Sequence, residues 1–294
     1  MDNVICFYRE PFFTYKGFAV IGVLACLLCG TLLCLRFRFG RRELPRMLGI
    51  VLLGFGGAIV MMKALSVGAK AIYQSSIGEP RGLVWLIEHA GAVFYGCVLG
   101  FLGVLALLLP RLVPQRRRLG LDIWATAFAL GHGFLRMGCY CATKVEDGWL
   151  VWHPCCGGIQ MDNAFCAHFY DSRLPTQLME SAAAFLLFAV MLTLLLRGKC
   201  RGKLPALYLG VYAVFRYLIE FVREGVMDVA IGPFSYAQFF SLLILLGILL
   251  VATLRQKGVL RAPPEDAPKD APKDAPEGTP EDVPETKDAK DASR

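Results

Sequence analysis

The chain has 294 residues, of which 56% are hydrophobic, a proportion typical of membrane proteins and not of soluble domains. It carries 31 Lys and Arg against 24 Asp and Glu, a formal net charge of +7. The basic residues cluster in short segments between long apolar stretches. The charge therefore indicates membrane topology and argues against nucleic-acid binding as its explanation.

Seven apolar stretches follow one another along the chain. A helix that crosses about 30 Å of hydrocarbon needs about 20 mostly apolar residues. We therefore expect an all-α integral membrane protein, a bundle of seven transmembrane helices at residues 17–36, 47–66, 90–109, 121–138, 177–196, 205–222 and 237–254. The fourth stretch is the least typical, because it is short and ends at Arg136.

Basic residues follow the first, third and fifth of these stretches. They are Arg36, Arg38, Arg41, Arg42 and Arg46, then Arg111, Arg116, Arg117 and Arg118, then Arg197, Lys199, Arg201 and Lys203. Since positively charged loops remain in the cytoplasm, we expect the N-terminus outside and the C-terminus inside. The chain is thus expected to cross a membrane several times.

After residue 260 the composition changes to proline, alanine and alternating charge, with a DAPK repeat. Such a sequence has too few apolar side chains to form a core. We therefore predict a transmembrane domain at residues 1–260 and a disordered cytoplasmic tail at residues 261–294. A partner-binding tail is the alternative, and only composition favours it.

The sixth stretch contains four ionisable residues in VYAVFRYLIEFVRE, at 211–224. Tyr212, Arg216 and Glu220 are spaced by four residues and Arg223 follows by three, so all of them share one helix face. An unpaired Arg in hydrocarbon costs at least about 2.5–3.5 kcal/mol. This face is therefore expected to look into the bundle. A local pair of Arg216 and Glu220 that snorkels outward is the alternative.

Other stretches bring further polar groups to the same depth. The fourth ends with His132 and Arg136, and the fifth begins with Gln177 and Glu180. In the predicted orientation three arginines and two carboxylates fall in the outer half of the bilayer, which favours an anion. A planar guanidinium binds phosphate oxygens in bidentate fashion. We predict a site for a phospholipid head group, with the acyl chains between helices.

Glycines in the third stretch would permit a neighbouring backbone or a lipid chain to approach closely. They are Gly91, Gly96, Gly100 and Gly103.

Four segments carry a resemblance to a known family: FYGCVLGFLG at 94–103, GFLRMGC at 133–139, LPTQLMES at 174–181 and YAVFRYLIEFVRE at 212–224. On these segments the chain resembles the bacterial prolipoprotein diacylglyceryl transferases. The family implies transfer of the diacylglyceryl group of phosphatidylglycerol to the lipobox cysteine thiol of a preprolipoprotein. A thioether forms at the outer leaflet of the bacterial plasma membrane, which is the location that the resemblance implies, and glycerol phosphate leaves. No cofactor or metal is expected; the partners are this lipid, the lipobox signal peptide and the bilayer, and we expect a monomer.

The resemblance also suggests site residues. By it, Arg136 matches the family's signature arginine, and Tyr212, Arg216, Glu220 and Arg223 match residues of its sixth span. We assign Arg136 and Arg216 to binding the phosphate and Glu220 to orienting an arginine. The predicted catalytic residues are Arg216, Arg136, Glu220, Tyr95 and Tyr212. The predicted substrate-binding residues are Arg136, Arg216, Arg223, Gln177, Glu180, Gly96 and Gly138. For Gln177 and Glu180 the alternative is a polar cap on the fifth span.

Two residues depart from the family pattern. Many members have a histidine where this chain has Tyr95, and usually an asparagine where it has Cys139. A tyrosine with an ordinary pKa of about 10 is a poor base at neutral pH. Activation of the thiol then requires a lowered pKa, water or another residue, of which His132 is the nearest candidate. A lipid-binding relative without turnover is therefore a second hypothesis.

The segment 139–175 is a cysteine-rich outer loop, expected to cap the site. Its cysteines are Cys139, Cys141, Cys155, Cys156 and Cys166. Disulfides are the simplest account outside a membrane; free thiols, or a zinc ion bound with His153 and His168, are the alternatives. A membrane protein that handles thiols or metals is a third hypothesis, but it leaves Arg136 and Arg216 unexplained.

Overall fold

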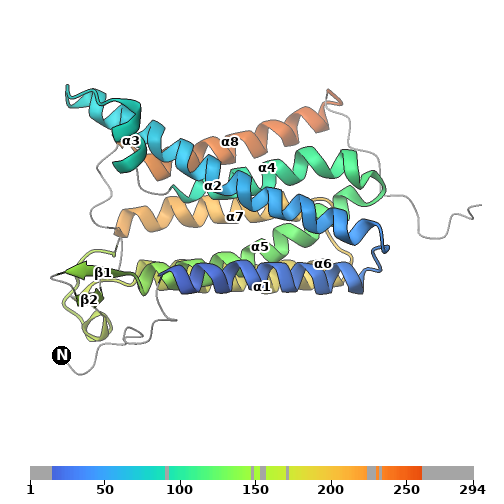
Figure 1. Ribbon diagram of the computed structural model, residues 1–294, viewed down its shortest axis with the longest axis horizontal. Helices are drawn as coiled ribbons and strands as arrows, with labels where there is room; N and C mark the ends of the chain where they lie inside the picture. The colour runs from blue at the N-terminus through green and yellow to red at the C-terminus, as the bar shows by residue number, and fades with distance from the viewer. Residues whose placement is uncertain are drawn as a thin grey trace, which may run out of the picture.

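The computed structural model describes residues 15–89, 93–146, 149–152, 157–169, 172–223, 230–231 and 234–259. Its long helices run side by side (Figure 1): α1 Tyr15–Arg36, α2 Glu43–Ser76, α4 Phe94–Leu112, α5 Arg117–Tyr140, α6 Thr176–Leu196, α7 Leu204–Ile219 and α8 Tyr236–Gln256. Shorter helical elements are α3 Leu83–His89, η2 Pro114–Arg116, η3 Cys166–His168 and η5 Glu220–Val222. The long helices form the bundle that the apolar stretches predict.

Six helices of the described chain are long and apolar enough to cross a membrane: α1, α2, α4, α6, α8, and α7 together with η5. They coincide with six of the seven predicted spans. Helix α5 forms at the place of the fourth, but polar residues lower its hydropathy. It is enclosed by the other helices, and every residue from Asp122 to Ala129 is buried. A helix shielded from lipid need not be apolar all round, so a seventh crossing stays a prediction.

Two short antiparallel hairpins depart from the all-helical expectation. One pairs β1 Thr143–Glu146 with β2 Trp149–Trp152, and the other pairs β3 Ala230–Ile231 with β4 Phe234–Ser235. The first lies in the cysteine-rich segment, at the end of the bundle where α3 also lies (Figure 1). The second hairpin directly precedes α8.

Glycines let α4 pack closely against α2. A methyl group at Gly96 would overlap the backbone of Met61 and Met62, and one at Gly100 would overlap Gly57. Of the two alternatives for this glycine-rich segment, the structure therefore shows close approach of a neighbouring backbone. By contrast, nothing lies within 4 Å of a methyl group built at Gly103.

A buried carboxylate fixes the start of α7. Asp122 of α5 is 0% exposed and accepts hydrogen bonds from the backbone nitrogens of Gly202 and Leu204, at 2.5 and 3.1 Å. A negative group at a helix N-terminus accepts hydrogen bonds from unpaired N–H groups and interacts favourably with the positive end of the helix dipole. Since α5 and α7 both begin at the basic end of the bundle, the last turns of both helices reach the opposite end.

Several sequence predictions concern residues outside the described ones. They are the placement of Gly91, His153, Cys155 and Cys156, and the disorder of the tail 261–294.

Candidate functional site

The polar face of α7 is turned into the bundle. Arg216 is 6% exposed, and its Nη1 lies 2.6 Å from Oε2 of Glu220. The pair expected from the four-residue spacing therefore forms. It is buried among helices, however, and does not snorkel outward to water as the alternative had it.

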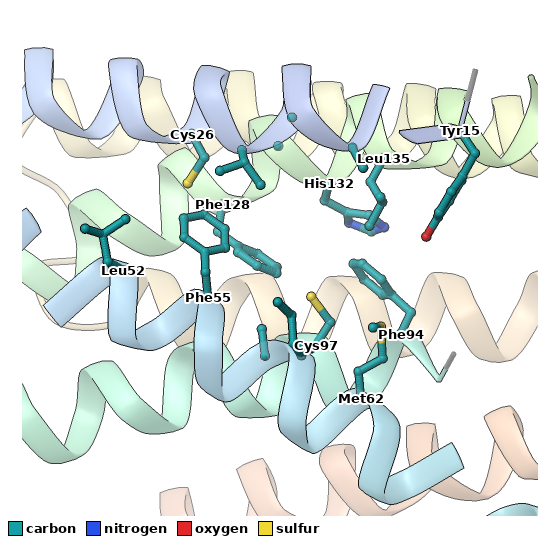
Figure 2. A pocket seen from close by; sticks show the side chains of 16 residues that line it. Tyr15, Cys26, Leu52, Phe55, Met62, Phe94, Cys97, Phe128, His132 and Leu135 are labelled. Carbon is teal, nitrogen blue, oxygen red and sulfur yellow. The ribbon is translucent and has the colours of Figure 1, made fainter. Parts of the chain in front are cut away.

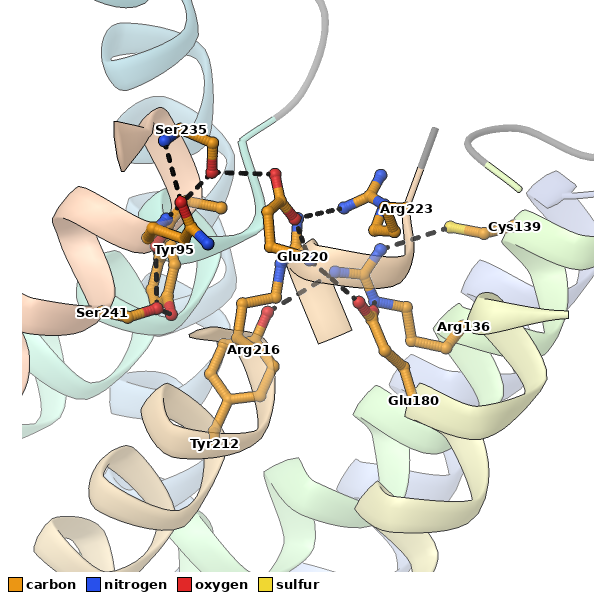
Figure 3. A network of polar contacts seen from close by, with 12 residues as sticks. Tyr95, Arg136, Cys139, Glu180, Tyr212, Arg216, Glu220, Arg223, Ser235 and Ser241 are labelled. Atoms are coloured by element: carbon orange, nitrogen blue, oxygen red, sulfur yellow. Dashed lines mark hydrogen bonds and ion pairs between the residues drawn. The ribbon is translucent and has the colours of Figure 1, made fainter. Parts of the chain in front are cut away.

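Glu180 of α6 joins two arginines from other helices (Figure 3). One of its carboxylate oxygens lies 2.5 Å from Nε of Arg136, on α5, and the other lies 3.4 Å from Nη1 of Arg216. The Glu180 side chain is only 3% exposed. It holds the two guanidinium groups beside each other at the end of the bundle remote from the basic segments.

Glu220 extends this network toward α8. Its Oε2 lies 3.5 Å from Nη1 of Arg223, and its Oε1 accepts a 3.0 Å hydrogen bond from Oγ of Ser235. Ser235 is the N-cap of α8 and forms a capping box with Gln238. The helix cap therefore also orients a carboxylate of the site.

The network carries an excess of positive charge. It joins three guanidinium groups, Arg136, Arg216 and Arg223, to two carboxylates, Glu180 and Glu220. Nε of Arg223 is buried and has no hydrogen-bond partner within the described residues. Uncompensated charge in a poorly solvated place is costly. An anion is thus the ligand that this arrangement favours.

The two predicted catalytic tyrosines differ in what they contact. Tyr212 accepts a 3.5 Å hydrogen bond from Nη2 of Arg136 and so belongs to the network. The hydroxyl of Tyr95 lies 2.5 Å from Oγ of Ser241, which itself donates to the carbonyl of Ala237. Because Ser241 has one hydroxyl hydrogen, it must accept from Tyr95. The hydrogen of Tyr95 is therefore directed away from the arginines, toward α8.

The remaining predicted residues surround the network. Gln177 is buried one turn before Glu180 on α6. Gly138 packs against α1, where a methyl group would lie 2.8 Å from Cβ of Phe18. Cys139, in the place of the family's asparagine, keeps its Sγ 3.9 Å from Nη1 of Arg136. Gly96 packs against the backbone of α2 and not against the network.

An apolar cavity of about 420 Å³ lies beside the network, between α1, α2, α4 and α5 (Figure 2). Its lining includes Leu52 and Ile59, which are 59% and 63% exposed on the outer surface of the bundle. The cavity therefore continues to the face that lipid would cover. Its size is typical of ligand pockets.

Phe94 separates the cavity from the network. The guanidinium of Arg136 lies over its ring, 4.7 Å from the centroid, and the imidazole of His132 stacks on it at 4.2 Å. Sequence reasoning missed Phe94, although it directly precedes Tyr95. It also missed Ser235, for which the S-x-x-Q pattern of a capping box was the available signal.

The cysteine-rich segment reaches the site through the backbone. The nitrogen of Ile159 donates to the carbonyl of Val222 at 2.9 Å, and Gly158 forms an isolated bridge with Arg223. This part of the segment therefore covers the end of α7, as a cap would.

No group of three or more His, Cys, Asp or Glu stands at metal-binding distance in the described part of the chain. Cys166 is a buried free thiol there. Three members of the candidate zinc set, His153, Cys155 and Cys156, lie outside it, so disulfides, zinc and free thiols stay open for the loop.

Comparison with known proteins shows which proteins this chain is similar to. A family model described as prolipoprotein diacylglyceryl transferase matches residues 7–253. The chain is 27% identical over 210 residues to phosphatidylglycerol–prolipoprotein diacylglyceryl transferase 2 of Clostridium perfringens, covering 67% of this chain and 77% of that protein. It is 30% identical over 239 residues to phosphatidylglycerol–prolipoprotein diacylglyceryl transferase of Xanthomonas oryzae pv. oryzae, covering 73% and 75%.

Proposed function

The chain belongs to the prolipoprotein diacylglyceryl transferase family, and from this premise we propose that it is a phosphatidylglycerol–prolipoprotein diacylglyceryl transferase of a bacterial membrane. It transfers the diacylglyceryl group of phosphatidylglycerol to the lipobox cysteine of a preprolipoprotein. The observation that carries the proposal is a buried, net positive arginine network beside an apolar cavity. This combination matches the two halves of a phospholipid.

Arg136 and Arg216 bind the phosphate in this proposal. The single negative charge of a phosphate diester balances the excess charge of the network. Glu180 holds both arginines in place through its two oxygens, and Glu220 positions Arg216 and Arg223. Guanidinium groups held by buried partners need little reorganisation when the lipid binds.

The reaction breaks the bond between the glycerol carbon and the phosphate oxygen. The cysteine sulfur attacks this carbon, a carbon–sulfur bond forms, and the electron pair of the broken bond moves to the phosphate, which leaves as glycerol phosphate. The phosphate gains negative charge as the bond breaks, so the arginines bind it more strongly in the transition state. One such interaction is typically worth about 10²–10³ in rate.

The thiol proton goes to water at the outer surface. Tyr95 does not receive it, because its hydroxyl is committed to Ser241. We assign Tyr95 to positioning α4 against α8, and Tyr212 to orienting Arg136.

The acyl chains lie in the apolar cavity and continue through the gap between α1 and α2 into the bilayer. The cavity-lining residues Leu52 and Ile59, which are exposed on the surface of the bundle, support this route. Gln177, Gly96 and Gly138 then act indirectly, by keeping the surrounding helices packed.

The site faces the outer leaflet, because it lies at the end of the bundle opposite the basic segments. Residues 1–260 form the transferase domain, with α5 as a seventh span, and residues 261–294 form a cytoplasmic tail. The lipobox signal peptide approaches beneath the segment 157–160. The protein acts as a monomer and needs no cofactor.

Purified protein in lipid nanodiscs tests this function. With phosphatidylglycerol and a lipobox peptide, mass spectrometry is expected to detect a peptide that has gained a diacylglyceryl thioether. With diacylglycerol, which lacks the phosphate leaving group, no product is expected. Peptide left unmodified after long incubation with phosphatidylglycerol would refute the transfer.

A lipid-binding relative without turnover is the second candidate. The hydrogen bond of Tyr95 to Ser241, at the position where many members carry histidine, favours it. Bound phosphatidylglycerol in the absence of product distinguishes this candidate from the enzyme.

A further inference from the structure

His132 is a buried histidine that the reaction described above does not use. It lies on α5, is 4% exposed, and lines the apolar cavity (Figure 2). Its Nδ1 lies 3.0 Å from the hydroxyl oxygen of Tyr208 on α7. Its Nε2 is buried and has no hydrogen-bond partner within the described residues. One nitrogen is thus satisfied and the other is left for a ligand.

The contact with Tyr208 determines which nitrogen carries the hydrogen. Tyr208 is 0% exposed, and the partner found for its hydroxyl among the described residues is Nδ1 of His132. We assign the hydroxyl of Tyr208 as the donor to Nδ1, because this direction leaves no hydrogen of the buried hydroxyl unpaired. In a neutral imidazole the hydrogen then resides on Nε2. His132 is thus arranged as a donor, which contradicts its use as a proton acceptor for the thiol.

The position of this donor indicates which group it meets. The imidazole stacks on Phe94, whose ring also lies under the guanidinium of Arg136. It is therefore one aromatic ring away from the proposed phosphate site, and it borders the proposed chain cavity. In a glycerophospholipid the ester carbonyls lie between the phosphate and the chains, joined to both through glycerol. A neutral carbonyl oxygen is a suitable acceptor in apolar surroundings.

We propose that Nε2–H of His132 donates a hydrogen bond to an acyl ester carbonyl of the bound lipid, and that this makes the site selective for ester-linked over ether-linked phosphatidylglycerol. The inference rests on the proposed function. His132 is a specificity-determining residue here and takes no part in proton transfer. Tyr208 acts through it, as a positioning residue that fixes the tautomer.

The test compares diacyl phosphatidylglycerol with its dialkyl ether analogue of equal chain length in the transfer assay. The bond that breaks is the same in both, so a difference reports recognition of the carbonyl. We expect the wild-type protein to favour the ester by about tenfold in kcat/KM, the usual worth of one neutral hydrogen bond.

The variant of choice is the double substitution His132→Phe with Tyr208→Phe. Phenylalanine keeps the stacking on Phe94, and the second change avoids leaving the Tyr208 hydroxyl unsatisfied. The ratio of kcat/KM for the ester lipid to that for the ether lipid is expected to fall to about one, while kcat/KM for the ether lipid stays unchanged. The control is Leu52→Ala in the same cavity, expected to affect both lipids equally and so to retain the preference.

Equal use of both lipids by the wild-type protein would overturn the proposal, as would a preference that persists in the double variant. A water molecule bound to Nε2 would produce the first of these results. Should no lipid give product, the proposed transfer fails, and competition between the two lipids for binding, measured by native mass spectrometry, still decides the inference. Retention of the ester preference in binding, and its loss in the double variant, would support it.

Discussion

Glu180 is the residue that joins the site across helices, because its two oxygens contact Arg136 and Arg216. Removal of one partner from a buried ion pair leaves an uncompensated charge, at a cost of about 3–5 kcal/mol. We expect Glu180→Gln, which raises the excess charge of the network, to lower stability strongly, and Arg136→Gln to lower it less, because Glu180 still pairs with Arg216. The cost of Glu180→Gln is expected to be much smaller in the Arg136→Gln background than in the wild-type protein. The measurement is a double-mutant cycle on thermal unfolding in detergent.

The exposed pair Arg81 and Glu79 provides the control for this cycle. Its side chains are 48% and 58% exposed, and exposed pairs contribute about 0–1 kcal/mol. A coupling energy for Glu180 and Arg136 no larger than that of the control pair would contradict the network.

Tyr95 allows a second test at the level of single residues. Tyr95→Phe removes the hydrogen bond to Ser241, but Ser241 still donates to Ala237. We therefore expect the rate of transfer to remain within about threefold of the wild-type rate. A general base would contribute about 10²–10⁴ in rate, so a loss of that size in steady-state kinetics would restore Tyr95 as a catalytic residue.

The sequence predicts which residues of α7 lie on one face, but not which side chains of other helices they contact. Spacing alone places Tyr212, Arg216 and Glu220 on one face, since helix geometry is local. The bridge from Glu180 and the edge-on contact of Tyr212 with Phe94 depend on how α4 and α6 pack against α7. No spacing within one helix carries that information.

Among the helices, the apolar stretches predicted six elements well because hydrophobic length is a strong signal. Helix α2 runs from Glu43 to Ser76, well beyond the predicted end at residue 66. Its last turns continue as helix after the apolar stretch ends. Hydropathy therefore does not predict where α2 ends. Helix α3 and the hairpins were missed for a related reason, since such short elements take their form from tertiary contacts.

The pairing of α2 with α4 yields a prediction at the level of elements. Gly100→Ala places a methyl group against the backbone of Gly57, whereas Gly103→Ala meets nothing within 4 Å. We expect the first to destabilise the protein by about 1–3 kcal/mol, and the second to be neutral or slightly stabilising. Thermal unfolding in detergent compares them. Equal stability of both variants would mean that the helices do not pack this closely.

At the scale of the whole molecule, the proposed orientation places the segment between α6 and α7 in the cytoplasm. Cys200 in this segment is exposed, so it serves as a natural probe. A membrane-impermeant maleimide is expected to label it only after cells are permeabilised. Cys200→Ser identifies the signal. Labelling of Cys200 in intact cells would reverse the topology and place the arginine network at the inner leaflet.

The central claim is that two guanidinium groups, held by one carboxylate, bind the phosphate of the lipid. Arg216→Lys tests it most directly, because lysine keeps the charge that Glu180 and Glu220 balance but lacks the planar fork. Thioether formation from phosphatidylglycerol is measured for this variant and for Arg197→Lys, an exposed change at the other end of the bundle. The account predicts a loss of about 10²-fold or more in kcat/KM for Arg216→Lys, with an unchanged rate for Arg197→Lys. Transfer by a folded Arg216→Lys variant at the wild-type rate would contradict it.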